Sequence, residues 1–300
     1  MKAAAFDYVR VQDLDQALEL LDQHGGDAKL LAGGQSLVPM MAMRLARPAL
    51  LVDIHRLEEL RAVTSQDQMV VTGAAVRQRT LEDDNALHAR LPLVAKALRW
   101  VGHSQTRNRG TVGGSLVHAH PSAELPLAAL VLGCTLRLTS KSEGERAVPA
   151  ADFFLGPMFT ATGDTECLTA IEWPIWPSHG TGCAFEEIAI RHGDFAMASA
   201  AAQLQLDANG VCVRASFGAG GIDGVPLVFA ELAMRLVGRH LDDALMQSVA
   251  AEASIACEPG NDEHASAEYR RHLTAVLVSR VLRQATQEAA QSIRRSAATA

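Results

Sequence analysis

Two glycine turns of similar composition constrain this chain more than any other feature. They read AGGQS at residues 32–36 and TVGGS at residues 111–115, and each has two glycines shortly before a serine. Glycine lets the backbone adopt positive φ and approach an anion, so that N–H groups and a serine hydroxyl can bind phosphate. A single glycine turn is most often only a turn. Two such turns favour a ligand with two phosphates, such as a pyrophosphate, held from both sides.

The second turn belongs to the stretch GTVGGSLVHAHP, which also allows a metal site. If this stretch is a strand, alternation places His118 and His120 on one face, a geometry that two metal ligands can use. No third ligand is evident nearby, although Glu124 is close in sequence. The ligand count therefore favours the anion, and we expect no metal site in this chain.

The first 55 residues predict a compact βαβ unit. Apolar residues at helical spacing predict a helix with two glycines as its stop: Leu14, Ala17, Leu18 and Leu21, then Gly25 and Gly26. A short buried strand at 28–31 follows, and it leads into the first glycine turn. A helix at 37–45 and a second buried strand at 50–54 then complete the unit.

The rest of the chain predicts further alternation of strands and helices. We expect a strand to begin at Gln68 and a helix to begin at Thr80. Two further helices are predicted for LPLVAKALRWVG and SAELPLAALVLG, and an alternating strand is predicted for CTLRLTS. Prolines and glycines predict a boundary near residues 173–182. Beyond it we expect a strand, a short helix, a hairpin closed by ANG and three helices. The last helix begins near Asp262 and has one apolar face: Tyr269, Leu273, Val276, Leu277, Val281 and Leu282.

Composition narrows the classes of partner and compartment. The formal net charge is −7, so the chain offers no basic field to nucleic acid. No signal peptide and no run of 18 apolar residues occurs, which predicts a cytoplasmic protein without membrane insertion. Five scattered cysteines without a C-x-x-C pair argue against a disulfide framework, a zinc ribbon or an iron–sulfur cluster in this chain.

Motifs of other enzyme classes are missing or incomplete. The P-loop and the G-x-S-x-G elbow are absent, and GAGGIDG at 218–224 departs from the dinucleotide pattern, so we expect a loop there. The stretch IRHGDFA allows two readings, a surface turn in which Asp194 caps a following helix, or a ligand contact. Trp100 and Phe185 are likewise either core aromatic residues or neighbours of a flavin ring. We expect no catalytic side chain.

Four stretches together resemble the FAD-binding medium subunit of the molybdenum hydroxylases. They are LLAGGQSLVPMMAMRLARPALLVDI, TRNRGTVGGSLVHAHPSAELP, FFLGPMFTATGDTECLTAIEWP and ASAEYRRHLTAVLVSRVL. The family includes the flavin subunits of carbon monoxide dehydrogenase, bacterial xanthine dehydrogenase and N-heteroaromatic dehydrogenases. The resemblance implies an α+β fold: a vanillyl-alcohol-oxidase-type FAD domain of two α+β subdomains, at 1–55 and 56–177. A C-terminal α+β domain at 178–290, with a small antiparallel sheet and three helices, and a disordered tail at 291–300 complete the expected chain.

The resemblance also implies which residues bind FAD. The two glycine loops would hold the pyrophosphate, and other residues would contact the rest of the cofactor. The implied set is Leu31, Ala32, Gly33, Gly34, Gln35, Ser36, Leu37, Val101, Thr111, Val112, Gly113, Gly114, Ser115, Glu124, Leu168 and Phe185. Relatives often have a lysine just after the position of Phe185, where this chain has Glu186 and Glu187. Relatives also commonly have an aspartate at the position where this chain has His120. Roles that depend on those charges do not transfer.

The implied function is electron transfer. A large molybdopterin subunit hydroxylates the substrate, a small subunit with two [2Fe–2S] clusters conducts the electrons, and FAD on this chain passes them to an acceptor. The resemblance also implies that the three subunits assemble as a dimer of heterotrimers. Two other readings remain open: a self-sufficient flavin reductase or oxidase of the same fold, and a non-enzymatic interaction module whose glycine turns are only structural.

Overall fold

The computed structural model describes residues 2–66 and 68–299, but not the side chains of residues 296–299. The chain divides into two compact units, and each is assembled from segments that are separate in the sequence. The first unit comprises Met1–Asp83, His103–Ala119 and Cys134–Trp173, and the second comprises Asp84–Gly102, His120–Gly133 and Pro174–Ala300. The expected contiguous domains at 1–55, 56–177 and 178–290 stay a prediction.

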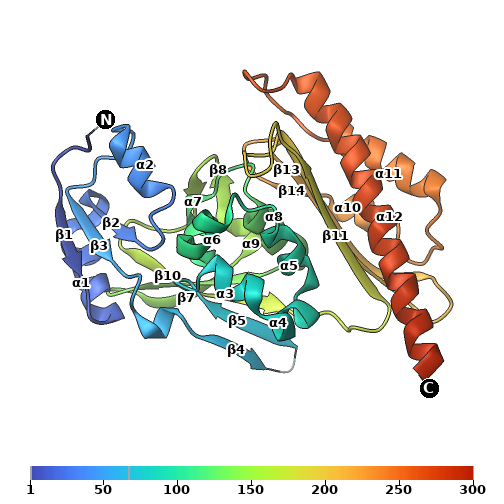
Figure 1. The fold of residues 1–300 in the computed structure, drawn as a ribbon, viewed down its shortest axis with the longest axis horizontal. Coiled ribbons are helices and arrows are strands. Elements are labelled where there is room, and N and C mark those ends of the chain that lie inside the picture. The colour runs from blue at the N-terminus through green and yellow to red at the C-terminus, as the bar shows by residue number, and fades with distance from the viewer. Residues whose placement is uncertain (1, 67, 300) are drawn as a thin grey trace. The chain divides into compact units, whose positions relative to one another are not determined.

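The first unit begins with a three-stranded parallel sheet in the order β1-β3-β2 (Figure 1). Its elements are β1 (Asp7–Arg10), α1 (Leu14–His24), the 3-10 turn η1 (Gly25–Asp27), β2 (Ala28–Leu31), α2 (Leu37–Ala42) and β3 (Leu50–Asp53). Ala17, Leu18 and Leu21 of α1 are buried, as their spacing predicts. Because all three strands are parallel, their carboxyl ends lie at one edge, where the loop of the first glycine turn begins.

Helix α2 is shorter than the predicted helix at 37–45. Arg44 adopts a positive φ of 60°, the N–H of Arg44 bonds to the carbonyl of Met41, and the N–H of Leu45 bonds to that of Met40. These two bonds form a Schellman motif, which satisfies the last carbonyls of the helix and ends it.

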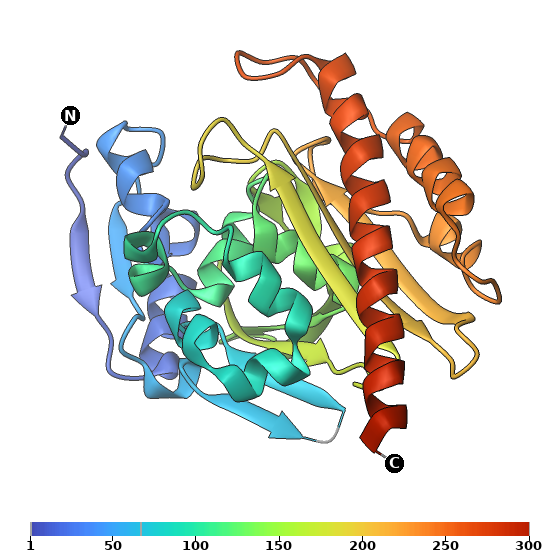
Figure 2. The same ribbon diagram turned by 45° about the vertical axis from the view of Figure 1, so that its right-hand side comes forward.

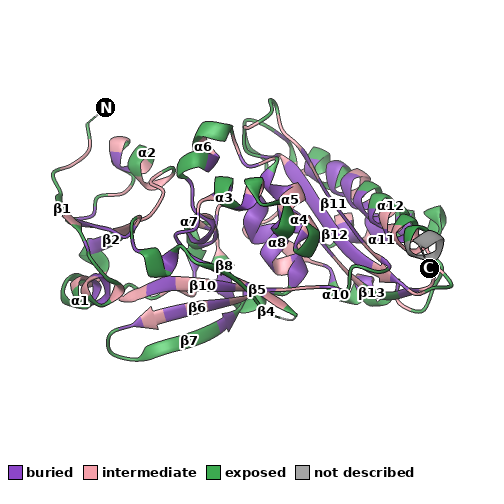
Figure 3. Cartoon of the chain, turned by 60° about the horizontal axis from the view of Figure 1, so that its bottom comes forward, coloured by how far each residue is buried: buried purple, intermediate pink, exposed green. Residues whose placement is uncertain are grey.

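The second sheet of this unit has the order β4-β5-β10-β6-β7. The remaining elements of the unit are η2 (Glu58–Leu60), β4 (Val63–Gln66), β5 (Met69–Gly73), α3 (Gln78–Asp83), α6 (Ser104–Arg109), α7 (Val112–His118), β6 (Thr135–Ser140), β7 (Gly144–Pro149), α9 (Ala150–Phe153), β8 (Phe154–Gly156), β9 (Phe159–Thr160) and β10 (Glu166–Pro174). Burial alternates along β6 as the sequence predicts, and β7 is an exposed edge strand (Figure 3). The indole N–H of the fully buried Trp173 donates to Thr72 at 2.9 Å.

The second unit is an antiparallel sheet, β11-β12-β13-β14, with helices on both faces. Its elements are α4 (Asn85–Arg90), α5 (Pro92–Leu98), α8 (Glu124–Leu132), β11 (Thr181–Ile188), β12 (Ala198–Leu206), β13 (Cys212–Gly220), β14 (Leu227–Val228), α10 (Ala230–Met234), α11 (Asp243–Ile255) and α12 (Ala267–Thr299). On one face Gly182 lies against the backbone of Ala285 in α12, and on the other Gly218 lies against Leu127 in α8.

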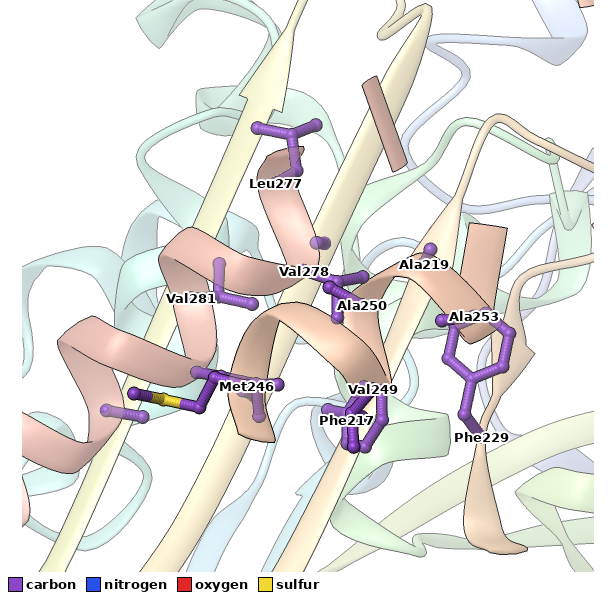
Figure 4. Close-up of a cluster of buried hydrophobic side chains, with 14 of the residues drawn as sticks. Phe217, Ala219, Phe229, Met246, Val249, Ala250, Ala253, Leu277, Val278 and Val281 are labelled. Atoms are coloured by element: carbon purple, nitrogen blue, oxygen red, sulfur yellow. The ribbon is translucent and has the colours of Figure 1, made fainter. Parts of the chain in front are cut away.

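Helix α12 runs across β11 and β12, and α11 packs beside it (Figure 2). The core between helices and sheet contains Phe217, Val249, Val278 and Val281, all fully buried (Figure 4). This arrangement confirms the predicted C-terminal α+β architecture with a small antiparallel sheet and three helices. The prediction for Tyr269 is wrong, because its side chain is 44% exposed.

Two other local predictions in this unit are wrong. No helix follows Asp194, because residues 189–197 form turns in which Gly193 has a φ of 91°. Helix α12 begins at Ala267 rather than near Asp262, whose carboxylate instead accepts the N–H groups of His264 and Ala265 before the helix. Helix α12 continues into the tail at 291–300 as far as Thr299, residue 300 lies outside the described residues, and the disorder of this tail stays a prediction.

No helix in the described part of the chain has both the length and the apolar character that a bilayer span requires.

Candidate functional site

The two glycine loops lie together in the first unit. A Cβ on Gly33 would be 2.5 Å from the carbonyl oxygen of Arg109 and 2.9 Å from the Cα of Gly110. These two residues directly precede Thr111, the first residue of the second loop. Only glycine permits this approach, so Gly33 is the residue that lets the first loop lie against the start of the second.

The second loop is the start of helix α7. Thr111 caps the helix, because its hydroxyl oxygen accepts the N–H of Gly114 at 3.0 Å. Gly113 is buried, and a Cβ there would be 2.5 Å from the Cβ of Ala74. Thr111, Val112 and Gly113 therefore serve packing within the unit, whereas Gly114 is exposed and Ser115 half-buried. The accessible part of this loop is smaller than the motif predicts.

The expected strand with His118 and His120 on one face is wrong. Helix α7 ends at His118, and Ala119 follows with a φ of 48°, so the two imidazoles do not alternate along a strand. Burial lowers the pKa of His118. The ring of His120 stacks on Phe195 with centroids 3.9 Å apart, and its Nδ1 accepts the N–H of Ser122. Among the described residues, no group of three or more acidic, His or Cys side chains is placed to hold a metal ion.

A cavity of about 510 Å³ opens beside the first glycine loop. It lies at the carboxyl ends of the parallel strands, the edge at which open parallel sheets commonly bind ligands. Its lining residues are Tyr8, Arg10, Leu31, Ala32, Gly33, Gly34, Gln35, Val38, Pro39, Asp53, His55 and Arg109. Leu31 to Gln35 were predicted as cofactor residues. Arg10, Asp53, His55 and Arg109 were not.

Asp53 organises the wall of this cavity. Its carboxylate accepts the N–H of His55 at 3.0 Å, lies 2.6 Å from Nδ1 of His55, and accepts the hydroxyl of Tyr8. Burial would raise the pKa of Asp53, but the hydrogen bonds from Tyr8 and His55 outweigh it and hold the pKa below its usual value. Asp53 is therefore an ionised positioning group that fixes Tyr8 and His55.

Two arginines give the cavity a cationic character. Arg10 and Arg109 both line it, and the Arg10 guanidinium lies 3.9 Å from Asp53. The guanidinium of Arg77 donates to the carbonyl of Arg109 and holds the backbone that meets Gly33. Cationic side chains beside a glycine loop suit a phosphate-bearing ligand.

Helix α6, which precedes the second loop, is held by a bidentate ion pair. Nε and an Nη atom of Arg107 each donate to Glu82 of α3 at 2.8 Å, and both side chains are mostly buried. The hydrogen bond from Arg107 is the main cause that lowers the pKa of Glu82. This pair thereby fixes the carboxyl end of α6, where Arg109 meets the first loop.

We expect Arg107→Met to lower the free energy of unfolding by about 2 kcal/mol at neutral pH, because it removes two charge-assisted hydrogen bonds. A lowered carboxyl pKa stabilises the fold above the usual value of 4.5, and this contribution disappears as the pH falls through the lowered pKa. The difference between variant and wild type should therefore shrink in acid. Urea unfolding across this range measures it, with Arg79→Met, an exposed partner of the same Glu82, as the matched control. Equal losses in both variants would contradict the role of Arg107.

The other predicted cofactor residues lie in different places. Ser36 precedes α2 and forms no capping hydrogen bond with its side chain, and Leu37 is the first residue of that helix. Leu168 is buried on β10 of the first unit. Val101, Glu124 and Phe185 belong to the second unit and are buried there. Their role toward a cofactor stays a prediction.

Comparison with known proteins decides the family. The family model described as "FAD binding domain in molybdopterin dehydrogenase" matches residues 4–176 of this chain. A second family model, described as "CO dehydrogenase flavoprotein C-terminal domain", matches residues 183–285. This chain belongs to the FAD-binding subunits of the molybdenum hydroxylases. The glycine loops and the cationic cavity of this flavin subunit lie within the first matched range.

Relatives of this flavin subunit match it along nearly their whole length. The 6-hydroxypseudooxynicotine dehydrogenase complex subunit alpha of Paenarthrobacter nicotinovorans is 36% identical over 96% of this chain and 97% of its own. The carbon monoxide dehydrogenase medium chain of Afipia carboxidovorans is 36% identical over 95% and 98%. The structure of quinoline 2-oxidoreductase from Pseudomonas putida 86 matches with a TM-score of 0.91 at 35% identity, over 96% of this chain and 99% of that one. The flavoprotein is thus an oxidoreductase subunit, and the predicted fold is confirmed.

Proposed function

We propose that this chain binds FAD and transfers electrons from the [2Fe–2S] clusters of a partner subunit to an external acceptor. The observation that carries the proposal is the glycine loop at the rim of a cavity lined by Arg10 and Arg109. Backbone N–H groups and two guanidinium groups together suit the two phosphates of a dinucleotide. The family membership supports FAD as that dinucleotide.

Within this proposal, residues 31–37, Gly114 and Ser115 hold the pyrophosphate, with Arg10 and Arg109 as additional cations. Val101, Glu124, Leu168 and Phe185 stay proposed neighbours of the rest of the cofactor. Bound FAD supplies the electron-accepting and electron-donating chemistry of its isoalloxazine ring. The chain itself supplies binding, orientation and charge.

The cysteine thiols do not offer a competing chemistry. All five are free and buried. Burial raises the pKa of Cys167, Cys183 and Cys257 to about 12, so these thiols stay protonated at neutral pH. Buried free thiols also accord with a reducing compartment, and we propose a cytoplasmic location.

We further propose that this chain works with a large molybdopterin subunit and a small [2Fe–2S] subunit, assembled as a dimer of heterotrimers. Relatives named as a complex subunit and as a medium chain support a multi-subunit assembly. Relatives of the same fold are also named for unlike substrates, carbon monoxide among them. The substrate is therefore chosen by the large subunit rather than by this chain.

The test is to purify the chain alone and together with its partner subunits. We expect the isolated chain to show a flavin absorption spectrum that dithionite bleaches and organic substrates do not. Substrate should bleach the flavin only in the complete complex. Bleaching by an organic substrate without partners would instead support the self-sufficient reductase or oxidase. A chain that takes up no added FAD would support the interaction module.

A further inference from the structure

A buried arginine bonds to two turns of the second unit. Arg270 lies near the start of α12 and is 7% exposed. Its Nη1 donates to the carbonyl oxygen of Met197 at 2.5 Å and to that of Gly221 at 2.7 Å, and its Nη2 donates to Asp262 at 2.6 Å. A planar guanidinium with several donors in a fixed fork suits acceptors that come from separate segments. Two of the three bonds go to the backbone rather than to a counterion.

The guanidinium contributes geometry more than stability. Removing a charged group from water is unfavourable, and an apolar side chain of similar volume often stabilises a fold as well as a buried ion pair does. The side chain of Asp262, the counterion, is itself 50% exposed, so solvent screens the pair. What an apolar residue could not do is fix two backbone carbonyl groups relative to each other. Arg270 therefore specifies where the two turns lie.

The two turns meet at a glycine. The first turn ends at Met197, and the second begins at Gly221, which has a φ of 72°. A Cβ on Gly221 would lie 2.9 Å from the carbonyl oxygen of Ala196 and 3.1 Å from Oγ of Ser122. The N–H of Gly221 donates to the carbonyl of Pro121 at 2.9 Å. The second turn thus lies between the first turn and the segment that precedes α8.

The segment before α8 is itself a tight turn. The N–H of Ala123 donates to the carbonyl of His120 at 2.9 Å, and Nδ1 of His120 accepts the N–H of Ser122 at 3.2 Å. The ring of His120 stacks on Phe195 of the first turn, with centroids 3.9 Å apart. Ala123 is the N-cap residue of α8 and has no side chain that could cap the helix. The tight turn therefore sets where α8 and its first residue, Glu124, begin.

We propose that Arg270 is a positioning residue of the cofactor site, which holds Glu124 in place through Gly221 and Pro121. The inference rests on the proposed function, in which Glu124 contacts FAD. One path consists of two hydrogen bonds, from the guanidinium to the carbonyl of Gly221 and from the N–H of Gly221 to the carbonyl of Pro121. The other path runs through the first turn to the stacked ring of His120. Without the guanidinium both turns can shift, and Glu124 loses its fixed place.

The first test follows the stacked rings by NMR in the flavin-free chain. A phenyl ring stacked on an imidazole moves the imidazole proton signals upfield, so we expect upfield signals of His120 in wild type that are absent in His120→Gln. Arg270→Met should lose most of this upfield shift. The matched control is Arg283→Met, which removes a guanidinium that bonds to Asp243 farther along α12 and should retain the shift. An unchanged shift in Arg270→Met would overturn the proposal.

The second test measures the affinity for FAD and the visible circular dichroism of the bound flavin. Arg270→Met should bind FAD about tenfold more weakly, the scale of coupling through a network of contacts, and should change the dichroism. Leu277→Ala removes buried contacts from the same helix and should leave both at wild-type values while the protein is folded. Wild-type affinity and dichroism in Arg270→Met would overturn the inference. If the proposed function fails instead, wild type itself takes up no FAD.

A second pair of variants keeps the guanidinium. Gly221→Ala places a methyl group where a carbonyl oxygen and a hydroxyl leave no room, so the turns must separate. The affinity for FAD and the His120 signals should then change as in Arg270→Met. The matched control is Gly238→Ala, because Gly238 has a φ of 80° and no described atom lies within 4 Å of the position of its Cβ. Equal effects of the two glycine variants would contradict the path through Gly221.

Discussion

Gly34→Val is expected to purify as a colourless protein with at least about a hundredfold weaker affinity for FAD, which corresponds to the loss of two charge-assisted hydrogen bonds. Gly34 lies on the cavity wall and has a φ of 70°, a region that valine rarely adopts. Its Cβ would also lie 3.2 Å from Leu31 and 3.3 Å from Val38. The loop must therefore change its conformation, and its N–H groups then turn away from the phosphates. Flavin absorbance and titration with FAD measure the effect.

The matched control is Gly144→Val. Gly144 has a similar φ of 74° and nothing within 4 Å of the position that a Cβ would take, but it is the first residue of β7 and does not line the cavity. Both variants therefore incur a similar backbone penalty, and circular dichroism shows whether both are folded. A folded Gly34→Val with wild-type affinity for FAD would contradict the placement of the pyrophosphate at this loop.

Phe217→Ala is expected to lower the free energy of unfolding by about 3–5 kcal/mol. Phe217 is fully buried on β13, its ring lies 5.6 Å from that of Phe229, and it packs among the residues between sheet and helices. Truncation removes apolar contacts and leaves a cavity that the surrounding helices close only in part. Urea unfolding followed by circular dichroism measures the loss. Val213→Ala, on the same strand but 47% exposed, should cost under about 1 kcal/mol. Similar costs for both variants would show that the sheet is not packed as described.

Local patterns predicted the elements that depend on local chemistry. The strand predicted at 28–31 matches β2. The predicted helix over Leu14 to Leu21 matches α1, because its apolar spacing and the glycine stop that follows it are local features. The strand predicted around His118 failed where two patterns competed. The spacing of His118 and His120 suggested a strand, but the Thr111 cap and the buried pair Val112 and Leu116, four residues apart, specify a helix.

The first glycine loop was predicted, but the charged wall of its cavity was not. Arg10 and Asp53 are the last residues of strands β1 and β3, and they become neighbours only because both strands are parallel and lie side by side. A predicted parallel sheet would have been enough to find them, since the carboxyl ends of its strands share an edge. The lowered pKa of the buried Asp53 could not be predicted, because it depends on a hydrogen bond from Tyr8, 45 residues away.

The interleaved segments of the second unit limit how this protein can be divided by engineering. Helices α5 and α8 come from the amino-terminal half of the chain, yet they cover a sheet that begins at Thr181. A cut between the two matched family ranges would therefore strip one sheet face of its helices and leave Leu127 without the strand it packs against. Recombination with a relative at that junction would pair the helices of one protein with the strands of the other. Chimeric flavin subunits should instead exchange the segments 84–102 and 120–133 together with the carboxyl-terminal half.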